Sequence, residues 1–358
     1  MQIRQKEGRE AEVRRQIWMN LLPLNDTYIV LSSDLNFYYL LHVPVAAMYW
    51  IGKGVKVLLV IVLRDNEDAT DHDFALMELI NFLEGEMNVK VIYYRNYTIP
   101  SSQFSQTVRA FAAGSEFAHT LDPDKTVFVT SDVDFFPRNI SSHIPNTHRG
   151  KEIMTYGPDG TDYIRWFGEK YHMYSMTSVG MTLRRWREVI GIPHDQPVDG
   201  KFIDSYINKT FDNRIHRQGM YWRWFLDQRF VSLKIKRWID KNEEKFREIS
   251  ERSCSGERLD RKYWPSAEEL EKMNLWEKYE SAHLTPGIVY EQIWNVNMPF
   301  YKKIFTEDQI KQLAGIREKV LSARDIKKYV THSYHPEFQN AFWKTIYNMD
   351  DMLNKTQH

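Results

Sequence analysis

The chain has 358 residues, 42% of them hydrophobic, so it can bury a sizeable core and is too apolar to be disordered. Its 48 basic and 48 acidic residues give a formal net charge of zero, which lacks the basic excess that general nucleic-acid binding needs. The sequence has one cysteine, which excludes an intrachain disulfide.

Expected strands and helices alternate through the first part of the chain. A charged segment over residues 1–24 is expected to be helical. After it, apolar and β-branched runs predict strands at 27–32, 55–63, 89–94 and 126–130, and helical spacing predicts helices at 37–52, 74–86 and 102–119. This order predicts a mostly parallel sheet with helices on both faces, which binds ligands outside the carboxyl ends of its strands.

The second part of the chain is less regular. We expect a strand at 152–156, and the segment 178–183 leads into a helix that carries Trp186 as a core residue. The aromatic run at 221–225 fits either core packing or a platform for a bound sugar. Residues 241–282 are charged and expected to be helical, and the last part of the chain reads as amphipathic helices.

The chain contains no obvious signal for secretion or membrane insertion. Its N-terminus lacks the apolar core of a signal peptide, and no apolar run reaches the ~18 residues that a membrane helix needs. The longest candidate, 43–63, is interrupted by Lys53, Gly54 and Lys56. We therefore expect a cytoplasmic protein without a transmembrane segment.

The acidic triplet Asp132-Val133-Asp134 follows the fourth expected strand directly. Alternation along an extended chain would point the two carboxylates to the same side. Two carboxylates at the end of a parallel strand suit a hard divalent cation, Mg²⁺ or Mn²⁺, which can bridge the phosphates of a nucleoside diphosphate. The alternative is a strand end with two solvated aspartates.

Other short motifs stand in a fixed order around the triplet. They are the turn with Ser33, Asp34 and Asn36 after the first strand, Arg109 in the preceding helix, the pair Asp227-Gln228, and His283 in Ser281-Ala-His-Leu-Thr-Pro-Gly287. This ordered set resembles the retaining glycosyltransferases of family 8, the group that includes glycogenin and bacterial galactosyltransferases. The resemblance implies a GT-A fold, a Rossmann-like sheet with helices on both faces and a helical C-terminal extension.

The resemblance also implies a division of the chain. The N-terminal helical segment would cover 1–24, and the GT-A catalytic domain 25–300, with a nucleotide-binding half at 25–137 and an acceptor half at 138–300. The C-terminal helical extension would cover 301–358. The implied activity is transfer of a sugar from a nucleoside-diphosphate sugar, expected to be a UDP-sugar, to a hydroxyl of a carbohydrate or glycoconjugate, with retention at the anomeric carbon.

The resemblance implies a role for each motif residue. The donor nucleotide would contact Ser33, Asp34 and Asn36 through its base and ribose, and Arg109 through its phosphates. The Mn²⁺ (or Mg²⁺) would bind Asp132, Asp134 and His283. The reaction centre would be lined by Asp227 and Gln228.

Several alternatives stay open at this point. Asp34 or Asn36 could simply cap the following helix, and His332 or His335 could replace His283 as the metal ligand. If the enzyme inverts, Asp227 would be the general base. A nucleotidyltransferase is disfavoured because the first turn lacks a Gly-rich loop. A degenerate domain that only binds carbohydrate or a partner is disfavoured because both aspartates of the triplet are present.

Overall fold

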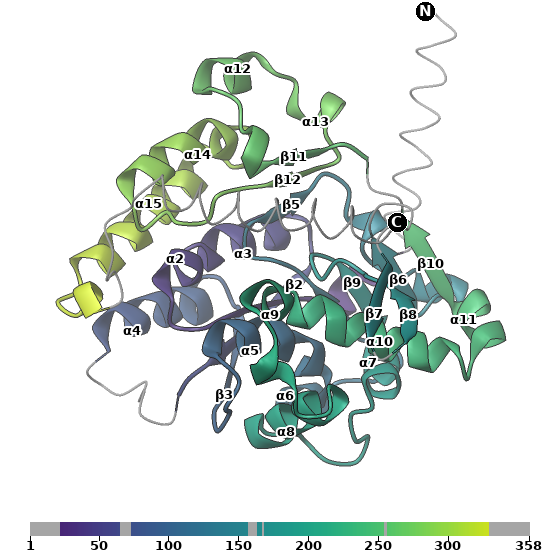
Figure 1. Ribbon diagram of the computed structural model, residues 1–358. Coiled ribbons are helices and arrows are strands. Elements are labelled where there is room, and N and C mark those ends of the chain that lie inside the picture. The colour runs from purple at the N-terminus through teal and green to yellow at the C-terminus, as the bar shows by residue number, and fades with distance from the viewer. Residues whose placement is uncertain (1–21, 65–72, 157–162, 167, 254–255, 329–358) are drawn as a thin grey trace, which may run out of the picture.

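The structure is a computed structural model that describes residues 22–64, 73–156, 163–166, 168–253 and 256–328. Its centre is a seven-stranded sheet with the strand order β10-β6-β9-β4-β1-β2-β3 (Figure 1). In chain order these strands are β1 (Thr27–Ser33), β2 (Lys56–Val62), β3 (Lys90–Tyr94), β4 (Val127–Thr130), β6 (Ile153–Tyr156), β9 (Val179–Thr182) and β10 (Ser250–Ser253).

The strand pairing confirms the predicted fold class. The four N-terminal strands are parallel, with β1 between β2 and β4. The sheet is mostly parallel because only β9 runs against its neighbours, β4 and β6. Strands from both predicted halves of the domain therefore belong to one continuous sheet.

The central strands are buried on both faces, which explains their uninterrupted apolar sequences. In β1, Ile29 and Leu31 belong to one core, whereas Tyr28 and Val30 belong to the other. The first core is covered by α2 (Phe37–Leu40), α3 (Val43–Gly52), α4 (Phe74–Asn81), α14 (Glu291–Ile304) and α15 (Glu307–Ser322). The second is covered by α5 (Ser101–Val108), the 3₁₀ segment η3 (Arg109–Gly114), α6 (Glu116–His119), α7 (Leu183–Ile190), α8 (Gly200–Thr210) and α10 (Leu226–Ile239).

Two expected helices are divided, and two terminal predictions are only partly covered. The helix expected at 37–52 consists of α2 and α3, and the one at 102–119 consists of α5, η3 and α6. Trp186 lies in the core as expected, and its indole N–H donates to the carbonyl of Phe128. The C-terminal extension is helical up to residue 328, while residues 1–21 and 329–358, with His332 and His335, lie outside the described residues.

The expectation that 241–282 is helical is wrong for much of the segment. Short helices are present, α11 (Glu243–Ile249), α12 (Ala267–Lys272) and α13 (Leu275–Lys278), but β10, β11 (Arg258–Asp260) and β12 (Ser281–His283) lie between them. β12 pairs with β11 and with β5 (Phe135–Pro137) in a three-stranded sheet. These strands are three or four residues long and pair with distant parts of the chain, so local propensity does not reveal them.

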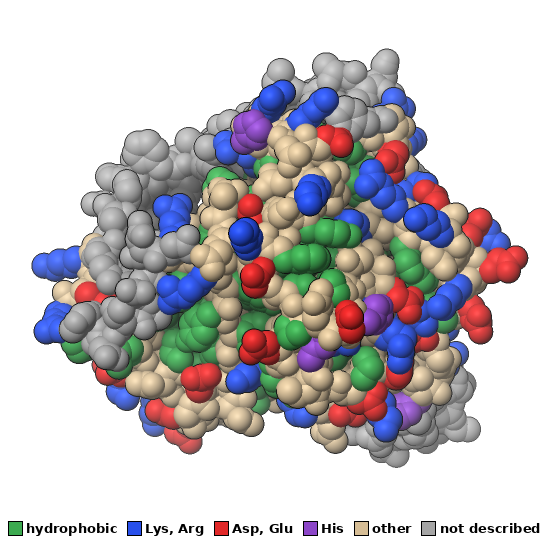
Figure 2. Space-filling model, turned by 90° about the horizontal axis from the view of Figure 1, so that it is seen from below, with side chains coloured by type: hydrophobic (Ala, Val, Ile, Leu, Met, Phe, Trp, Pro, Cys, Tyr) green, Lys and Arg blue, Asp and Glu red, His purple; other side chains and the backbone are tan. Residues whose placement is uncertain are grey.

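The remaining elements lie beside this framework. β7 (Tyr163–Trp166) and β8 (Glu169–His172) form an antiparallel pair, and α9 (Met220–Trp224) precedes α10. None of the described helices is long and apolar enough to cross a membrane. Figure 2 shows one face of the molecule, on which basic and acidic side chains are interspersed.

Gly180, in the inner strand β9, has no room for a side chain. A Cβ atom at this position would lie 2.6 Å from the backbone oxygen of His143 and 3.0 Å from Cδ of Pro145. We expect Gly180→Ala to lower the free energy of unfolding by about 1–3 kcal/mol, measured by urea denaturation. Gly315→Ala in α15 is the control, because a Cβ there meets nothing within 4 Å. Equal stability of the two variants would contradict this packing.

Candidate active site

The candidate site lies at the carboxyl ends of β1 and β4. The two strands are parallel neighbours, and the backbone N–H of Ser131 donates to the carbonyl of Val30 over 3.1 Å. The chain segments that follow both strands therefore start side by side. This places Asp132 next to the turn after β1, as expected for a parallel sheet.

The acidic triplet forms a turn and does not continue the strand. The N–H of Phe135 approaches the carbonyl of Asp132 at 3.4 Å, and β5 starts immediately afterwards. The expected reason for the common direction of the two carboxylates, strand alternation, is therefore wrong. Asp132 and Asp134 nevertheless line the same cavity, because the turn brings both to the sheet edge.

A buried histidine holds this turn from behind. Nδ1 of His42 donates to the carbonyl of Val133 over 2.7 Å, so its Nε2 accepts from the hydroxyl of Tyr301 at 2.9 Å. Burial lowers the pKa of His42 to about 4, which keeps the ring neutral at physiological pH. The backbone between the two aspartates is thus fixed by a neutral, fully hydrogen-bonded side chain.

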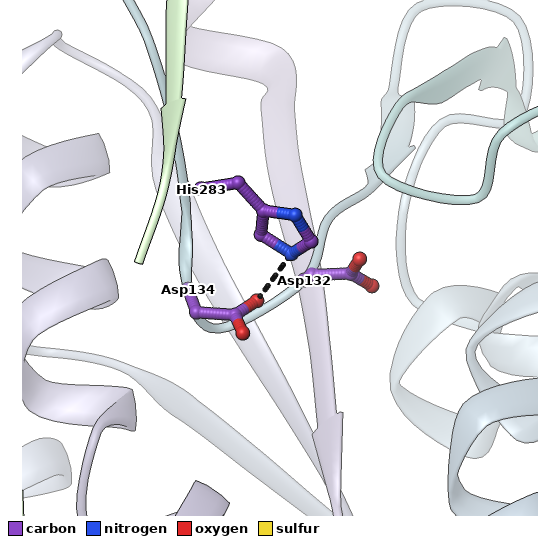
Figure 3. A group of neighbouring side chains, drawn as sticks. All are labelled: Asp132, Asp134 and His283. Carbon is purple, nitrogen blue, oxygen red and sulfur yellow. Dashed lines mark ion pairs between the residues drawn. The ribbon is translucent and has the colours of Figure 1, made fainter. Parts of the chain in front are cut away.

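β12 brings His283 to the triplet from far along the chain. β12 pairs antiparallel with β5, so that His283 lies opposite Phe135, and the N–H of Leu284 donates to the carbonyl of Asp134 over 2.9 Å. As a result, ligand atoms of Asp132, Asp134 and His283 all lie within 4.8 Å of one another. Figure 3 shows the imidazole above the two carboxylates, with Nε2 directed toward Asp134.

This group has the chemistry of a divalent-cation site. Two carboxylates and an imidazole form a ligand set that suits Mn²⁺. Mg²⁺ can be coordinated by the two carboxylates. Oδ1 of Asp134 and Nε2 of His283 are 3.2 Å apart, close enough to share one cation. Asp134 is buried, whereas Asp132 is partly exposed and open to the cavity. The three residues therefore fit the ion that the motifs imply.

Arg109 holds two of the predicted site residues. It lies at the start of η3 and is buried. Its Nη1 donates to Asp132 at 2.5 Å and to the carbonyl of Ser131, while its Nη2 donates to Asp227 at 2.7 Å. Arg109 therefore holds two carboxylates in position. The guanidinium nitrogens that make these contacts are the ones that were expected to bind the donor phosphates.

Asp227 and Gln228 lie in the first turn of α10. Asp227 is buried, and its two carboxylate oxygens accept from Arg109 and from the backbone N–H of Gln228. Burial raises the pKa of Asp227, against the opposing effect of Arg109. Gln228 lines the cavity beside it.

The turn after β1 combines a structural role with a place in the cavity. The side chain of Asn36 accepts from the N–H of Tyr38 and caps α2, and Asp34 accepts from the N–H of Asn36. The predicted helix cap is therefore present. Ser33, Asp34 and Asn36 also line the cavity, so capping does not exclude ligand contact.

All nine predicted site residues line one cavity of about 500 Å³. This volume falls in the range of small-molecule sites. The aromatic run at 221–225 is divided between the two expected roles: Trp222 packs against Trp166 and Phe211, whereas Trp224 and Phe225 line the cavity. A larger hollow of about 880 Å³ lies along β11 and includes Tyr263 and Trp264, but none of the predicted site residues.

Three charged residues at the site were missed by the sequence analysis. Nη2 of Arg261 lies 3.0 Å from Oδ2 of Asp134 and 2.5 Å from Nε2 of His283. Oδ2 of Asp260 lies 3.6 Å from Nδ1 of His283, and Arg258 lines the cavity. Burial opposes ionisation of Asp134, but Arg261 and His283 outweigh it and hold the pKa of Asp134 well below its usual range. The first and last residues of β11 are Arg258 and Asp260, and Arg261 follows directly, all in the segment expected to be helical.

No family model and no curated protein matches the chain. Among solved structures, the chain is similar to the galactosyltransferase LgtC in complex with donor and acceptor sugar analogues, at 10% identity and a TM-score of 0.35, over 80% of this chain and 99% of that one. It is also similar to the apo-form glycosyltransferase GlyE of Streptococcus pneumoniae TIGR4, at 11% identity and a TM-score of 0.31, over 83% and 64%. Both are glycosyltransferases, the class that the motifs indicate, but likeness at this level assigns no activity to this chain.

Proposed function

We propose that this chain is a metal-dependent glycosyltransferase that moves a sugar from a nucleoside-diphosphate sugar, a UDP-sugar in the first instance, to a hydroxyl acceptor on a carbohydrate or glycoconjugate. The observation that carries the proposal is the convergence of nine residues from five segments on one cavity at the carboxyl edge of a mostly parallel sheet. A cation group, polar groups for a nucleoside and a buried acid–amide pair meet there.

The residues divide the cavity into parts with different tasks. Ser33, Asp34 and Asn36 offer hydroxyl, carboxylate and amide groups to the base and ribose of the donor. Asp132, Asp134 and His283 would hold the cation. A divalent cation in this place neutralises charge on the departing diphosphate.

Arg109 is assigned a positioning role in this proposal. It fixes Asp132, a cation ligand, and Asp227, at the reaction centre, through one guanidinium group. A change at this residue would therefore disturb both parts of the site at once. The bidentate geometry of arginine suits two carboxylates in fixed positions.

Retention is proposed from the order of the motifs and not from the contacts of Asp227. Each oxygen of Asp227 accepts one hydrogen bond, from Arg109 or from the N–H of Gln228, which leaves further lone pairs on the carboxylate. We propose retention, with Gln228 beside the anomeric carbon. If the enzyme inverts, Asp227 would be the general base.

The experiment that tests the proposal is a donor panel. Purified protein is incubated with UDP-, GDP-, ADP- and CMP-linked sugars and Mn²⁺, with and without EDTA, and release of the free nucleotide is followed. We expect slow hydrolysis of one class of donor that stops in EDTA. No metal-dependent turnover of any donor, together with no binding of any nucleoside diphosphate, would overturn the proposal. The anomeric configuration of the product, read by NMR, tests retention separately.

A further inference from the structure

Arg261 lies where it shares partners with the cation. Its Nη2 contacts both Oδ2 of Asp134 and Nε2 of His283, at 3.0 and 2.5 Å. Only 11% of its side chain is exposed, and that of Asp134 is 4% exposed. The guanidinium is thus a positive charge inside the group of atoms that would bind the metal.

The contact with His283 places the guanidinium against both ring nitrogens. Nη2 of Arg261 lies 2.5 Å from Nε2 and 3.4 Å from Nδ1 of the imidazole. A metal ion bound to Nε2 and to Asp134 would therefore lie directly beside this positive charge, in a place that is largely shielded from water. The two cations therefore compete for the same buried pair.

Arg261 also balances the charge of the buried carboxylate. Its Nη2 lies 3.0 Å from Oδ2 of Asp134, and removing the guanidinium would leave Asp134 without this cationic partner. A divalent cation bound to Asp134 would supply the same charge balance.

We propose that Arg261 is a displaceable internal cation, which competes with Mn²⁺ or Mg²⁺ for the Asp134–His283 pair and moves away from it when the metal binds. Arg261 therefore weakens the apparent affinity for the metal. The effect grows with the fraction of molecules in which its guanidinium contacts Asp134 and His283. The inference rests on the cation site of the proposed function, but it does not depend on sugar transfer. Arg261 also lines the donor cavity, so its guanidinium, once displaced, is next to the space proposed for the diphosphate.

The test measures Mn²⁺ binding to the substrate-free protein by EPR, through the signal of unbound Mn²⁺. We expect Arg261→Met to bind Mn²⁺ at least about tenfold more tightly than the wild type, because the metal no longer has to displace a guanidinium group. Arg258→Met is the matched control. Arg258 lines the same cavity and has the same charge, but its ion pair is with Asp260. It should tighten binding by a few-fold at most, through long-range charge alone.

A second measurement uses the wild-type protein and so does not depend on whether Arg261→Met folds. Phenylglyoxal modification of Arg261 in the wild type, followed by mass spectrometry, should be faster with Mn²⁺ than in EDTA, because the displaced guanidinium enters the cavity. Equal or weaker Mn²⁺ affinity in Arg261→Met, no Mn²⁺ binding by either protein, or slower modification with Mn²⁺ would each overturn the inference. Tighter Mn²⁺ binding, without turnover of any nucleotide sugar and without binding of any nucleoside diphosphate, would leave the inference standing and remove the proposed function.

Discussion

Asp134→Asn is expected to reduce metal-dependent donor turnover by about a thousandfold, because in the proposed function the cation would contribute several kcal/mol at the leaving diphosphate, and each ~1.36 kcal/mol is a factor of ten. The amide keeps the shape of the carboxylate but loses the negative charge that attracts the cation. Binding of Mn²⁺ should fall in parallel. The measurement is kcat/KM with the best donor, together with the Mn²⁺ affinity.

The choice of substituent matters at this position. Asp134 is the buried partner of Arg261, so Asp134→Ala would leave a buried guanidinium without its carboxylate and destabilise the fold. Asp122→Asn is the control for the loss of one acidic charge, because Asp122 is half-exposed and its ion pair is with the exposed Lys125. The amide oxygen of Asn can still accept from the backbone N–H groups of Asp124 and Lys125, as the carboxylate does. Turnover within a few-fold of wild type in Asp134→Asn would show that the triplet is not the cation site.

Arg109→Met is expected to give the largest combined effect on stability and activity. It leaves Asp227 buried without its cationic partner, which costs about 3–5 kcal/mol of the free energy of unfolding. It also releases Asp132 from its fixed position, so metal-dependent turnover should fall by about a hundredfold, as is typical when support of a metal ligand is lost. Urea denaturation and donor kinetics measure the two effects.

A double variant separates the two roles of Arg109. Arg109→Met with Asp227→Leu removes both the cation and the buried carboxylate, so much of the lost stability should return, whereas turnover should stay low. Arg109→Lys keeps one charge but cannot contact both aspartates in the same geometry, and we expect it to rescue stability better than activity. If the double variant recovered both stability and turnover, the positioning role would be refuted.

The central sheet could be predicted because its signal is local. β1, β2 and β4 are buried on both faces, and each is a nearly continuous apolar run that ends at a polar turn. Asp132 and Asp134 were found for the same reason, since they follow such a run directly. The position of the site at the carboxyl edge then follows from parallel pairing.

The partners of these residues could not be predicted, because they depend on long-range contacts. Arg109 contacts Asp227, 118 positions away in the sequence. Residues 241–282 are charged, and no local pattern distinguishes the strand pair β11–β12 from a surface helix. The sequence analysis therefore placed Arg109 on the phosphates and overlooked Arg261, whose role depends on the same strand pair. His283 was found through motif order alone.

The most direct test of the proposed site is a crystal structure of the wild-type protein with Mn²⁺ and UDP. We expect Mn²⁺, located by its anomalous scattering, to be coordinated by Asp132, Asp134 and His283 and by the diphosphate. The uridine should lie beside Ser33, Asp34 and Asn36. Arg261 should have moved off His283. An ion bound elsewhere, or a nucleotide outside the 500 Å³ cavity, would contradict the account.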